Sequence, residues 1–204
     1  MQAPQGQRWR LLATFNSGFQ FADAHGGFVV NGRTYEPLVA GQGTLVMYRD
    51  GHVDVLSWHG GTTAGPDVVV ARQNLPLIVS DAQPNAKLGV PNLWGATLGN
   101  AVRVWRSGIG VDARGNLIYL AAPEQTAASL ARALIHAGAV RAMELGINAE
   151  WPSFITYPRA GAQDPQKLVP NAMQPATRYL TPDDRDFFAV FGSVAGAGFT
   201  VPFR

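Results

Sequence analysis

The sequence predicts an α+β fold in which a mixed, largely antiparallel sheet, built from hairpins, carries one main crossover helix. Two observations support this class. The chain contains 23 glycines and 14 prolines among its 204 residues, so many turns and short strands are expected. Short apolar segments separated by turn residues fill the first half of the chain, whereas a clear helical pattern occurs only later, at residues 126–137.

The first half is expected to form one strand followed by two hairpins. Residues 9–15 (WRLLATF) suit a buried strand and run into the polar turn 16–19, where Gly18 allows a positive φ. Asn31-Gly32 and Asp50-Gly51 are tight-turn pairs. The strands beside these turns are expected at residues 27–31, 33–38, 44–49 and 52–58, with a further strand at 75–79.

The second half is expected to hold a strand–helix–strand unit. Residues 81–100 are rich in proline and glycine and are predicted to be irregular. A long irregular span in a compact domain is often a functional loop. Strands follow at 102–111 and 116–121. The helix 126–137 places Leu130, Ala133, Leu134 and Ala137 on one apolar face, and Thr126 suits its N-cap. With the apolar segment that follows, residues 116–145 make one right-handed crossover.

Near the end of the chain, a short helical turn is expected at residues 181–184, because threonine and proline stand at the cap and first helical positions. Residues 187–191 suit a last strand. The three aspartates at 183, 184 and 186 are interpreted as helix-start acids rather than cation ligands. We therefore expect a lead-in at 1–8, a single domain at 9–191, and a Gly- and Ala-rich tail at 192–204.

Composition excludes several classes of function. The hydrophobic content of 47% and charged content of 15% are those of a globular protein. The net charge is only +2 and no basic cluster stands out, so nucleic acid is not expected as a partner. No apolar run approaches the roughly 18 residues of a membrane-spanning helix. The chain has no cysteine, and its polar first residues do not suggest a signal peptide.

The familiar nucleotide, hydrolase and metal motifs are missing. The sequence has no phosphate-binding P-loop and no G-x-S-x-G elbow, and Gly108-Ile109-Gly110 lacks the third glycine of a dinucleotide fingerprint. The four histidines show no ligand spacing, and His136 is interpreted as a surface residue near a helix end. No metal site is therefore assigned and no cofactor is expected. A divalent cation stays open, because oxygen ligands leave little trace in a sequence.

Three stretches remain as candidate site segments. The turn containing Asn16 and Gly18 is either functional or a simple turn in which asparagine bonds its own backbone. Arg106 and Ser107 precede two close glycines, an arrangement that suits an oxyanion or phosphate, although a solvated arginine at a strand edge fits equally.

The third stretch is residues 139–152 (AVRAMELGINAEWP), where a buried strand ends in a polar loop. Open α/β sheets place ligands at such strand ends. Glu144 and Glu150 could perform acid–base chemistry, and Asn148 could bind a ligand, although acidic surface loops are also common.

Together these stretches resemble the phosphodiester glycosidase family, relatives of the lysosomal enzyme that uncovers mannose 6-phosphate. That family carries an N-G-G-F-like turn, an R-[TS]-x-I-G strand, and a helix followed by an L-D-G-G-G-S-like loop. The counterparts here are ATFNSGF at 13–19, RSGIGV at 106–111 and AMELGINAEW at 142–151. Residues 27–32 and Trp94-Gly95 fit the same order. The resemblance spans residues 9–191 and is best with a bacterial branch.

The sequence departs from the family at one position. Gly146 stands where the family has aspartate, and Ile147, Asn148 and Ala149 replace the glycines that follow. If that aspartate is part of the family's catalytic machinery, this chain is expected to be a weak or inactive enzyme. Glu144 lies two residues earlier on the strand, a displacement that is large on the scale of catalytic geometry. Glu150 in the loop is the freer candidate.

The resemblance implies a hydrolase of a sugar-1-phosphodiester bond on a glycan or cell-envelope polymer, and an extracytoplasmic or secreted location. On that reading Arg106 holds the phosphate, while Asn16 and Asn148 bond sugar hydroxyls or phosphate oxygens. Glu150, or less readily Glu144, activates water. Gly18, Ser107 and Gly146 complete the substrate site.

Two alternatives remain open. The first is a catalytically silenced domain that binds a glycan or envelope polymer, with Trp94 or Trp151 stacking on sugar rings, although tryptophans are more often buried in a core. The second is a structural or regulatory module with a fossil site. The sequence does not indicate the oligomeric state.

Overall fold

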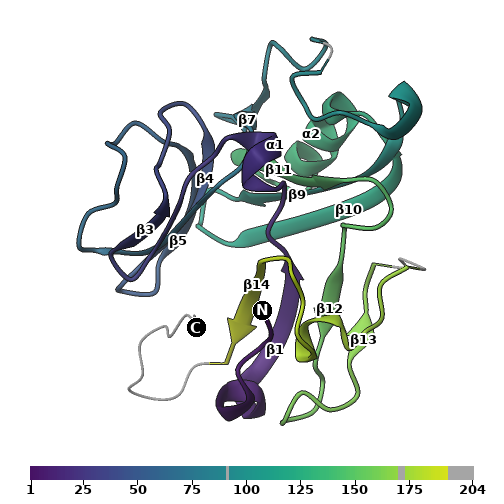
Figure 1. Cartoon of the computed structure of the whole chain (residues 1–204). Helices are drawn as coiled ribbons and strands as arrows, with labels where there is room; N and C mark the ends of the chain where they lie inside the picture. The colour runs from purple at the N-terminus through teal and green to yellow at the C-terminus, as the bar shows by residue number, and fades with distance from the viewer. Residues whose placement is uncertain (91, 170–172, 193–204) are drawn as a thin grey trace.

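The computed structural model describes residues 1–90, 92–169 and 173–192 (Figure 1). Their strands form three sheets, of four, five and five strands, and all strand pairs in this part of the chain are antiparallel. Helices are few and short. The predicted α+β class with largely antiparallel pairing is confirmed, and the strands divide among three sheets.

The four-stranded sheet joins the two ends of the described chain. Its order is β13 (Gln166–Lys167), β12 (Phe154–Thr156), β1 (Leu11–Asn16) and β14 (Phe187–Phe191). Phe15 holds it together, because its ring packs 5.6 Å from the ring of Phe154 and 5.3 Å from that of Phe188. The expected first strand begins later than predicted: Trp9 lies in a 3-10 helix, Gln5–Arg10, and is 56% exposed.

A five-stranded sheet contains both predicted hairpins. Its order is β3 (Arg33–Glu36), β2 (Phe28–Val30), β6 (Val68–Gln73), β4 (Gly43–Tyr48) and β5 (Val53–Ser57). The β2–β3 and β4–β5 pairs confirm the hairpin predictions. The central strand β6 was not predicted. All six of its residues are buried, so its sequence shows no polar alternation to mark it as a strand.

The second five-stranded sheet carries the predicted crossover. Its order is β10 (Leu117–Gln125), β9 (Val104–Val111), β11 (Arg141–Ile147), β7 (Leu77–Ser80) and β8 (Gln83–Pro84). Both β10 and β11 pair antiparallel with β9, so they run parallel to each other. The helix α2 (Ala127–His136) connects them, which confirms the strand–helix–strand unit.

Local chemistry explains α2. Thr126 accepts a hydrogen bond from the Ser129 backbone N–H, and the Ser129 side chain accepts one from the Thr126 N–H, which is a capping box. Leu130 and Leu134 are fully buried against the sheet. Burial of this apolar face stabilises a helix that would be too short to persist alone.

The remaining elements are one-turn helices. They are α1 (Phe21–Ala24) and the 3-10 helices Leu98–Asn100 and Arg178–Leu180. The helical turn expected at 181–184 is wrong, since the 3-10 turn ends at Leu180 and Thr181 is extended. Asp183 instead accepts a hydrogen bond from Arg178 at 2.7 Å. The predicted tail lies outside the described residues from position 193 onward.

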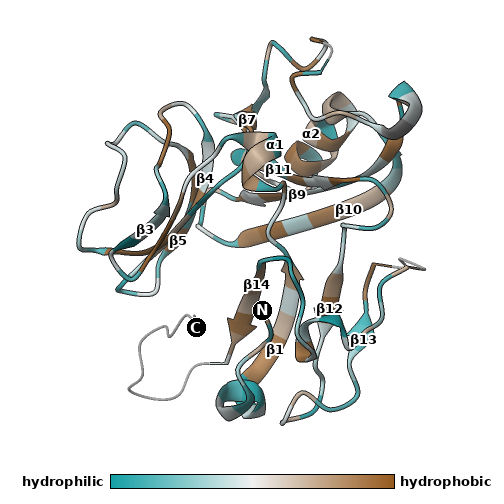
Figure 2. Ribbon diagram, in the orientation of Figure 1, coloured by the Kyte–Doolittle hydropathy of each residue, from teal (hydrophilic) through white to brown (hydrophobic). Residues whose placement is uncertain are grey.

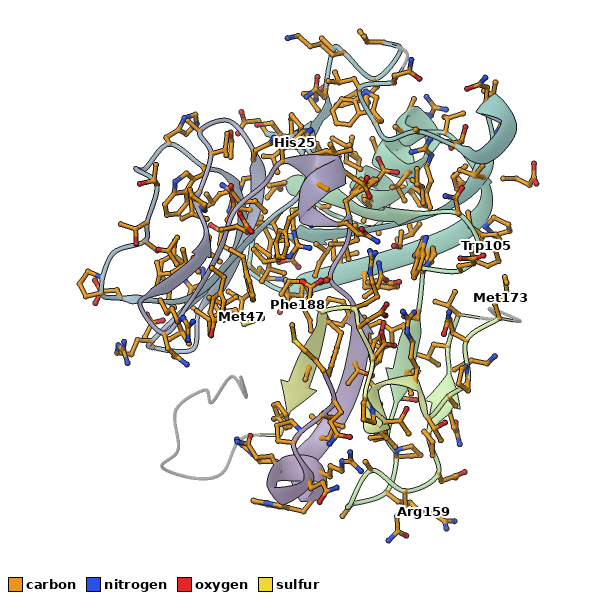
Figure 3. All side chains as sticks on the ribbon, viewed as in Figure 1. His25, Met47, Trp105, Arg159, Met173 and Phe188 are labelled. Atoms are coloured by element: carbon orange, nitrogen blue, oxygen red, sulfur yellow. The ribbon has the colours of Figure 1, made fainter. Side chains whose placement is uncertain are left out.

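The main core lies where the three sheets meet. One buried cluster takes residues from all of them, including Met47 of β4 and Phe188 of β14, which Figure 3 labels. Strands β1, β5 and β10 consist largely of apolar residues, while the connecting loops are more polar (Figure 2). Within the described part of the chain, no helix has the length and apolar character needed to cross a membrane.

Candidate functional site

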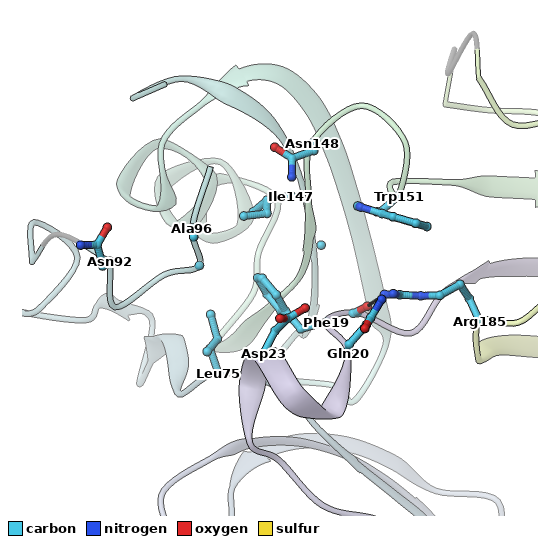
Figure 4. A pocket seen from close by; sticks show the side chains of 13 residues that line it. Phe19, Gln20, Asp23, Leu75, Asn92, Ala96, Ile147, Asn148, Trp151 and Arg185 are labelled. Carbon is cyan, nitrogen blue, oxygen red and sulfur yellow. Dashed lines mark hydrogen bonds between the residues drawn. The ribbon is translucent and has the colours of Figure 1, made fainter. Parts of the chain in front are cut away.

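A cavity of about 420 Å³ opens at the carboxyl end of β11 (Figure 4). Segments far apart in the chain form its wall: the turn after β1, the helix α1, the irregular span before β9, the end of β11 and the segment before β14. We call it the loop cavity. The described residues that line it are Gly18, Phe19, Gln20, Asp23, Leu75, Asn92, Gly95, Ala96, Gly146, Ile147, Asn148, Trp151 and Arg185.

The turn after β1 is held by a buried asparagine. Gly18 has a φ of 126°, and a Cβ at this position would lie 2.1 Å from the side-chain oxygen of Asn74, so glycine is required. The Asn74 side chain accepts a hydrogen bond from the Phe19 N–H and donates one to the Ser17 carbonyl. The backbone that forms this wall of the cavity is therefore fixed.

The same turn is tied to the segment before β14. Arg72 of β6 is fully buried and forms a 2.7 Å ion pair with Asp186. It also donates to the Phe19 carbonyl, while the Ser17 hydroxyl donates to the Asp186 carbonyl. Arg185 precedes Asp186 in the chain, so this network holds Arg185 close to the turn after β1.

Arg185 brings a positive charge to the loop cavity. Its guanidinium lies 4.5 Å from the centre of the Trp151 ring and donates a hydrogen bond to the Gly18 carbonyl at 3.0 Å. Both side chains line the cavity and are half-buried. A guanidinium that is stacked on an indole and fixed at one N–H is preorganised to pair with an anion through its other N–H groups.

Polar groups face this cation across the cavity. Asp23 of α1 and Asn148, the residue after β11, point into the space from opposite sides (Figure 4). Asn148 has a φ of 73°, a conformation that asparagine tolerates better than most residues. Asp23 is the one carboxylate among the described residues that line the cavity.

A β-bulge decides which side chains of β11 face this site. The pairing of β11 with β9 shifts between Glu144, opposite Gly108, and Gly146, opposite Ser107. Directly opposite residues of an antiparallel pair face the same side of a sheet. Glu144 therefore faces α2, because a Cβ on Gly108 would lie 3.0 Å from a leucine of that helix. Gly146 faces the opposite side, with Ser107.

The absence of a side chain at Gly146 lets three neighbouring side chains pack closely against its backbone. A Cβ at Gly146 would lie 3.1 Å from the Asn16 side-chain nitrogen, 3.6 Å from the Trp151 Cβ and 3.7 Å from the Ser107 hydroxyl oxygen. Asn16 is buried, donating to Ser107 and accepting from the Tyr119 hydroxyl at 2.8 Å.

Arg106 and Glu144 form a buried pair behind the cavity. Their side chains meet at 2.5 Å, and Arg106 also donates to the backbone carbonyls of Trp94 and Gln125. Burial raises the pKa of Glu144 to about 7, although the Arg106 charge and hydrogen bond act to lower it. The second Glu144 oxygen is buried without a hydrogen-bond partner among the described residues.

The glycines after Arg106 have a packing role. A Cβ on Gly108 would press on Leu134 of α2, and one on Gly110 would lie 2.7 Å from the Arg141 carbonyl oxygen. They allow β9 to approach its neighbours closely and do not line the cavity. The suggestion that they accommodate an oxyanion has no support in this geometry.

The structure brings together most of the predicted binding residues. Gly18, Gly146 and Asn148 line the cavity, and Asn16 and Ser107 lie directly behind Gly146. The predicted catalytic residues do not reach it: Arg106 and Glu144 lie behind it, and Glu150, in the turn after β11, is absent from the described lining. Trp94 is buried and donates to the Lys87 carbonyl, so it belongs to the core.

Sequence reasoning missed Arg185 and Asp23. Arg185 lies in a stretch interpreted as the start of a helix, and no local pattern indicated its approach to Trp151. Asp23 lies four residues beyond Phe19 in a one-turn helix too short to give a periodic signal. Among the described residues, no group of three or more histidine or acidic side chains is placed to hold a metal ion.

Comparisons with known proteins show a shared fold. No protein-family model and no curated protein sequence matches the chain. The structure is similar to the catalytic domain of zebrafish N-acetylglucosamine-1-phosphodiester alpha-N-acetylglucosaminidase, auto-inhibited by its pro-peptide, with a TM-score of 0.59 and 14% identity. The match covers 93% of this chain and 66% of the zebrafish chain.

A hypothetical protein from Synechocystis matches with a TM-score of 0.49 and 13% identity, over 82% of this chain and 51% of its own. The similarity to the zebrafish domain shows a distant structural relationship. The chain has a phosphodiester glycosidase-like fold.

Proposed function

We propose that the chain binds a sugar 1-phosphodiester of a glycan or cell-envelope polymer in the loop cavity, and that it hydrolyses this ligand slowly or not at all. The observation that carries the proposal is the Arg185 guanidinium stacked on Trp151 at the cavity wall. A phosphodiester carries one negative charge and two free oxygens, which a fixed guanidinium can bind through parallel hydrogen bonds.

The rest of the wall suits the sugar. Trp151 offers an aromatic edge, and the side chains of Asp23, Gln20 and Asn148 offer hydrogen-bond partners for hydroxyl groups. A volume of about 420 Å³ lies within the usual range for small-ligand pockets. The fold shared with the zebrafish domain supports the choice of a sugar phosphodiester over other anions.

Slow hydrolysis follows from Gly146. The family to which the motifs are similar has aspartate at this position, and the bulge turns position 146 toward Asn16 and Ser107. Glu144 does not replace that aspartate, because it faces the other side of the sheet and pairs with Arg106. Glu150 lies outside the described lining.

Binding is tested by calorimetry with a methyl phosphodiester of N-acetylglucosamine 1-phosphate and with the free sugar. Arg185→Gln should weaken phosphodiester binding about tenfold or more, since hydrogen bonds to charged groups contribute roughly 1.5 to 3 kcal/mol. Arg114→Gln is the matched control, because Arg114 lies in the β9–β10 turn with its side chain 85% exposed. Equal affinity of wild type and Arg185→Gln would remove the proposed anion site.

Hydrolysis is the second candidate function, and the position of Asp23 favours it. Asp23 could activate water at the anomeric carbon, and a phosphodiester leaves as a weakly basic anion with little need of a general acid. Asp23→Asn should then abolish turnover. Gly146→Asp should create or increase turnover. If wild type hydrolyses no sugar phosphodiester and Gly146→Asp does, the chain is a silenced relative that binds without cutting.

A further inference from the structure

The loop cavity holds two opposite charges that do not neutralise each other. Arg185 and Asp23 both line it, and their side chains enter the space from different walls (Figure 4). Neither side chain takes part in an ion pair within the part of the chain that the structure describes. The Asp23 carboxylate also accepts no hydrogen bond there. Both charged groups therefore face the cavity without a protein partner of opposite charge among the described residues.

The cations beside Arg185 already have carboxylates of their own. Arg72 pairs with Asp186 at 2.7 Å, and Arg178 pairs with Asp183, also at 2.7 Å. Arg185 lies between these two aspartates in the chain and pairs with neither. Its positive charge is therefore available to a ligand in the cavity.

A single buried arginine fixes the position of both charges. The Arg72 guanidinium lies 4.3 Å from the centre of the ring of Phe21, the first residue of α1, and Asp23 follows two residues later. The same guanidinium pairs with Asp186, the residue after Arg185. Asp23 and Arg185 are thus attached to one part of the core. Their spacing is set before a ligand binds, which lowers the entropic cost of binding.

Apolar side chains lie beside the two charges. Those that line the cavity are Phe19, Leu75, Ile147 and Trp151. Apolar walls strengthen electrostatic interactions in a cavity relative to those in open solution. A ligand with only a negative charge is attracted by Arg185 and repelled by Asp23, whereas a ligand that also carries a positive charge satisfies both residues.

We propose that the loop cavity selects a zwitterionic ligand, a phosphodiester that binds Arg185 and carries an ammonium group that pairs with Asp23. The inference rests on the proposed function and deepens it, because it specifies a sugar 1-phosphodiester with a protonated amine. The ligand's net charge of zero matches that of the two residues together. Gln20 and Asn148 remain as hydrogen-bond partners for hydroxyl groups.

The amine can stand on either side of the phosphate. It is carried by the sugar, as in glucosamine, or by the alcohol at the other end of the diester, as in an aminoethyl ester. In both, the same short chain of bonds separates the amine nitrogen from the phosphorus. The cavity recognises the same pair of charges in the two cases, so the experiment has one arm for each.

The first arm measures binding by calorimetry at about pH 6, where such amines are protonated. It compares the methyl phosphodiester of glucosamine 1-phosphate with that of glucose 1-phosphate, in which a hydroxyl replaces the ammonium. Wild type should prefer the glucosamine diester about fivefold, as expected for one partly exposed ion pair, and high salt should reduce the preference.

The second arm compares the aminoethyl and ethyl phosphodiesters of N-acetylglucosamine 1-phosphate under the same conditions. A preference of the same size is expected if the amine belongs to the alcohol. Preference in one arm alone supports the proposal and assigns the amine to that side of the phosphate.

Asp23→Asn should abolish the preference in either arm. Its affinity for the diesters without an amine should be unchanged or slightly higher, because the carboxylate that repels the phosphate is gone. A merely structural role of Asp23 would weaken all of these ligands equally and leave their ratio unchanged. Asp67→Asn is the matched control, since Asp67 is exposed just before β6 and does not line the cavity.

The outcomes separate this inference from the proposed function. Binding of sugar phosphodiesters with no amine preference, or with a preference that persists in Asp23→Asn, overturns the zwitterion proposal alone. Absence of binding by every sugar phosphodiester overturns the proposed function. Glycerophosphoethanolamine, which has the two charges but no sugar, then tests the charge pairing by itself: binding that is lost in Asp23→Asn supports the pairing, and absence of binding overturns it too.

Discussion

The wild-type protein is expected to lose stability as pH rises because of Glu144. Replacing Glu144 with glutamine should remove this loss. Glu144 is fully buried, and burial raises its pKa from 4.5 to about 7. In the unfolded chain the carboxyl loses its proton near the lower value. Between the two values the folded state holds one proton more than the unfolded state, so stability falls as pH increases.

The magnitude follows from the difference between the two pKa values. Each unit corresponds to about 1.4 kcal/mol, so the wild type should lose about 3 kcal/mol in total across this range, most of it between about pH 5 and pH 7. The glutamine side chain stays neutral at every pH and keeps an oxygen for Arg106. The free energy of unfolding of Glu144→Gln should therefore lack this fall.

Urea denaturation of both proteins at about pH 5 and pH 8 gives the change in unfolding free energy with pH for each of them. Subtracting the change in Glu144→Gln from the change in wild type isolates the effect of Glu144, because the other titrating groups contribute equally to both. The same substitution at Glu36, an exposed residue of β3, controls for the loss of one carboxylate. Parallel pH dependence of wild type and Glu144→Gln would refute the reasoning. It would mean that the pairing with Arg106 fully offsets the cost of burying the charge.

Two further substitutions test the local structure. Gly18→Ala should destabilise the protein by more than about 2 kcal/mol in urea denaturation, because it combines a positive φ with a clash against Asn74, whereas Gly65→Ala should be close to neutral. Thr126→Ala should lower the unfolding free energy by about 1 kcal/mol, since it removes the capping box with Ser129, and an unchanged thermal midpoint would contradict that role.

The sequence predicted those elements whose formation depends on residues close together in the chain. The two hairpins needed only their tight-turn pairs and flanking apolar runs, and α2 needed only its cap and its apolar spacing. Strands β6, β8, β12 and β13 were not predicted. The first is buried throughout, and the other three have only two or three residues each, so their formation depends on pairing with a neighbouring strand.

The candidate site was likewise predicted in part: the sequence identified three of its segments but not the roles of their side chains. The three motif stretches do converge, as Asn16, Ser107 and Gly146 show. Their individual roles were less predictable. Arg106 carries a charge that suggested phosphate binding, yet its hydrogen bonds go to a buried carboxylate and two backbone carbonyls.

The sequence by itself determined the α+β class, the tight turns and the main helix, because each depends on residues close together in the chain. Only the tertiary structure decided which side chains face the cavity. One extra residue in β11 turns Gly146 toward Asn16 and Glu144 toward α2, and a contact across the fold brings Arg185 onto Trp151. A strand's side chains change face with a shift of one residue, and such a shift is set by the neighbouring strand.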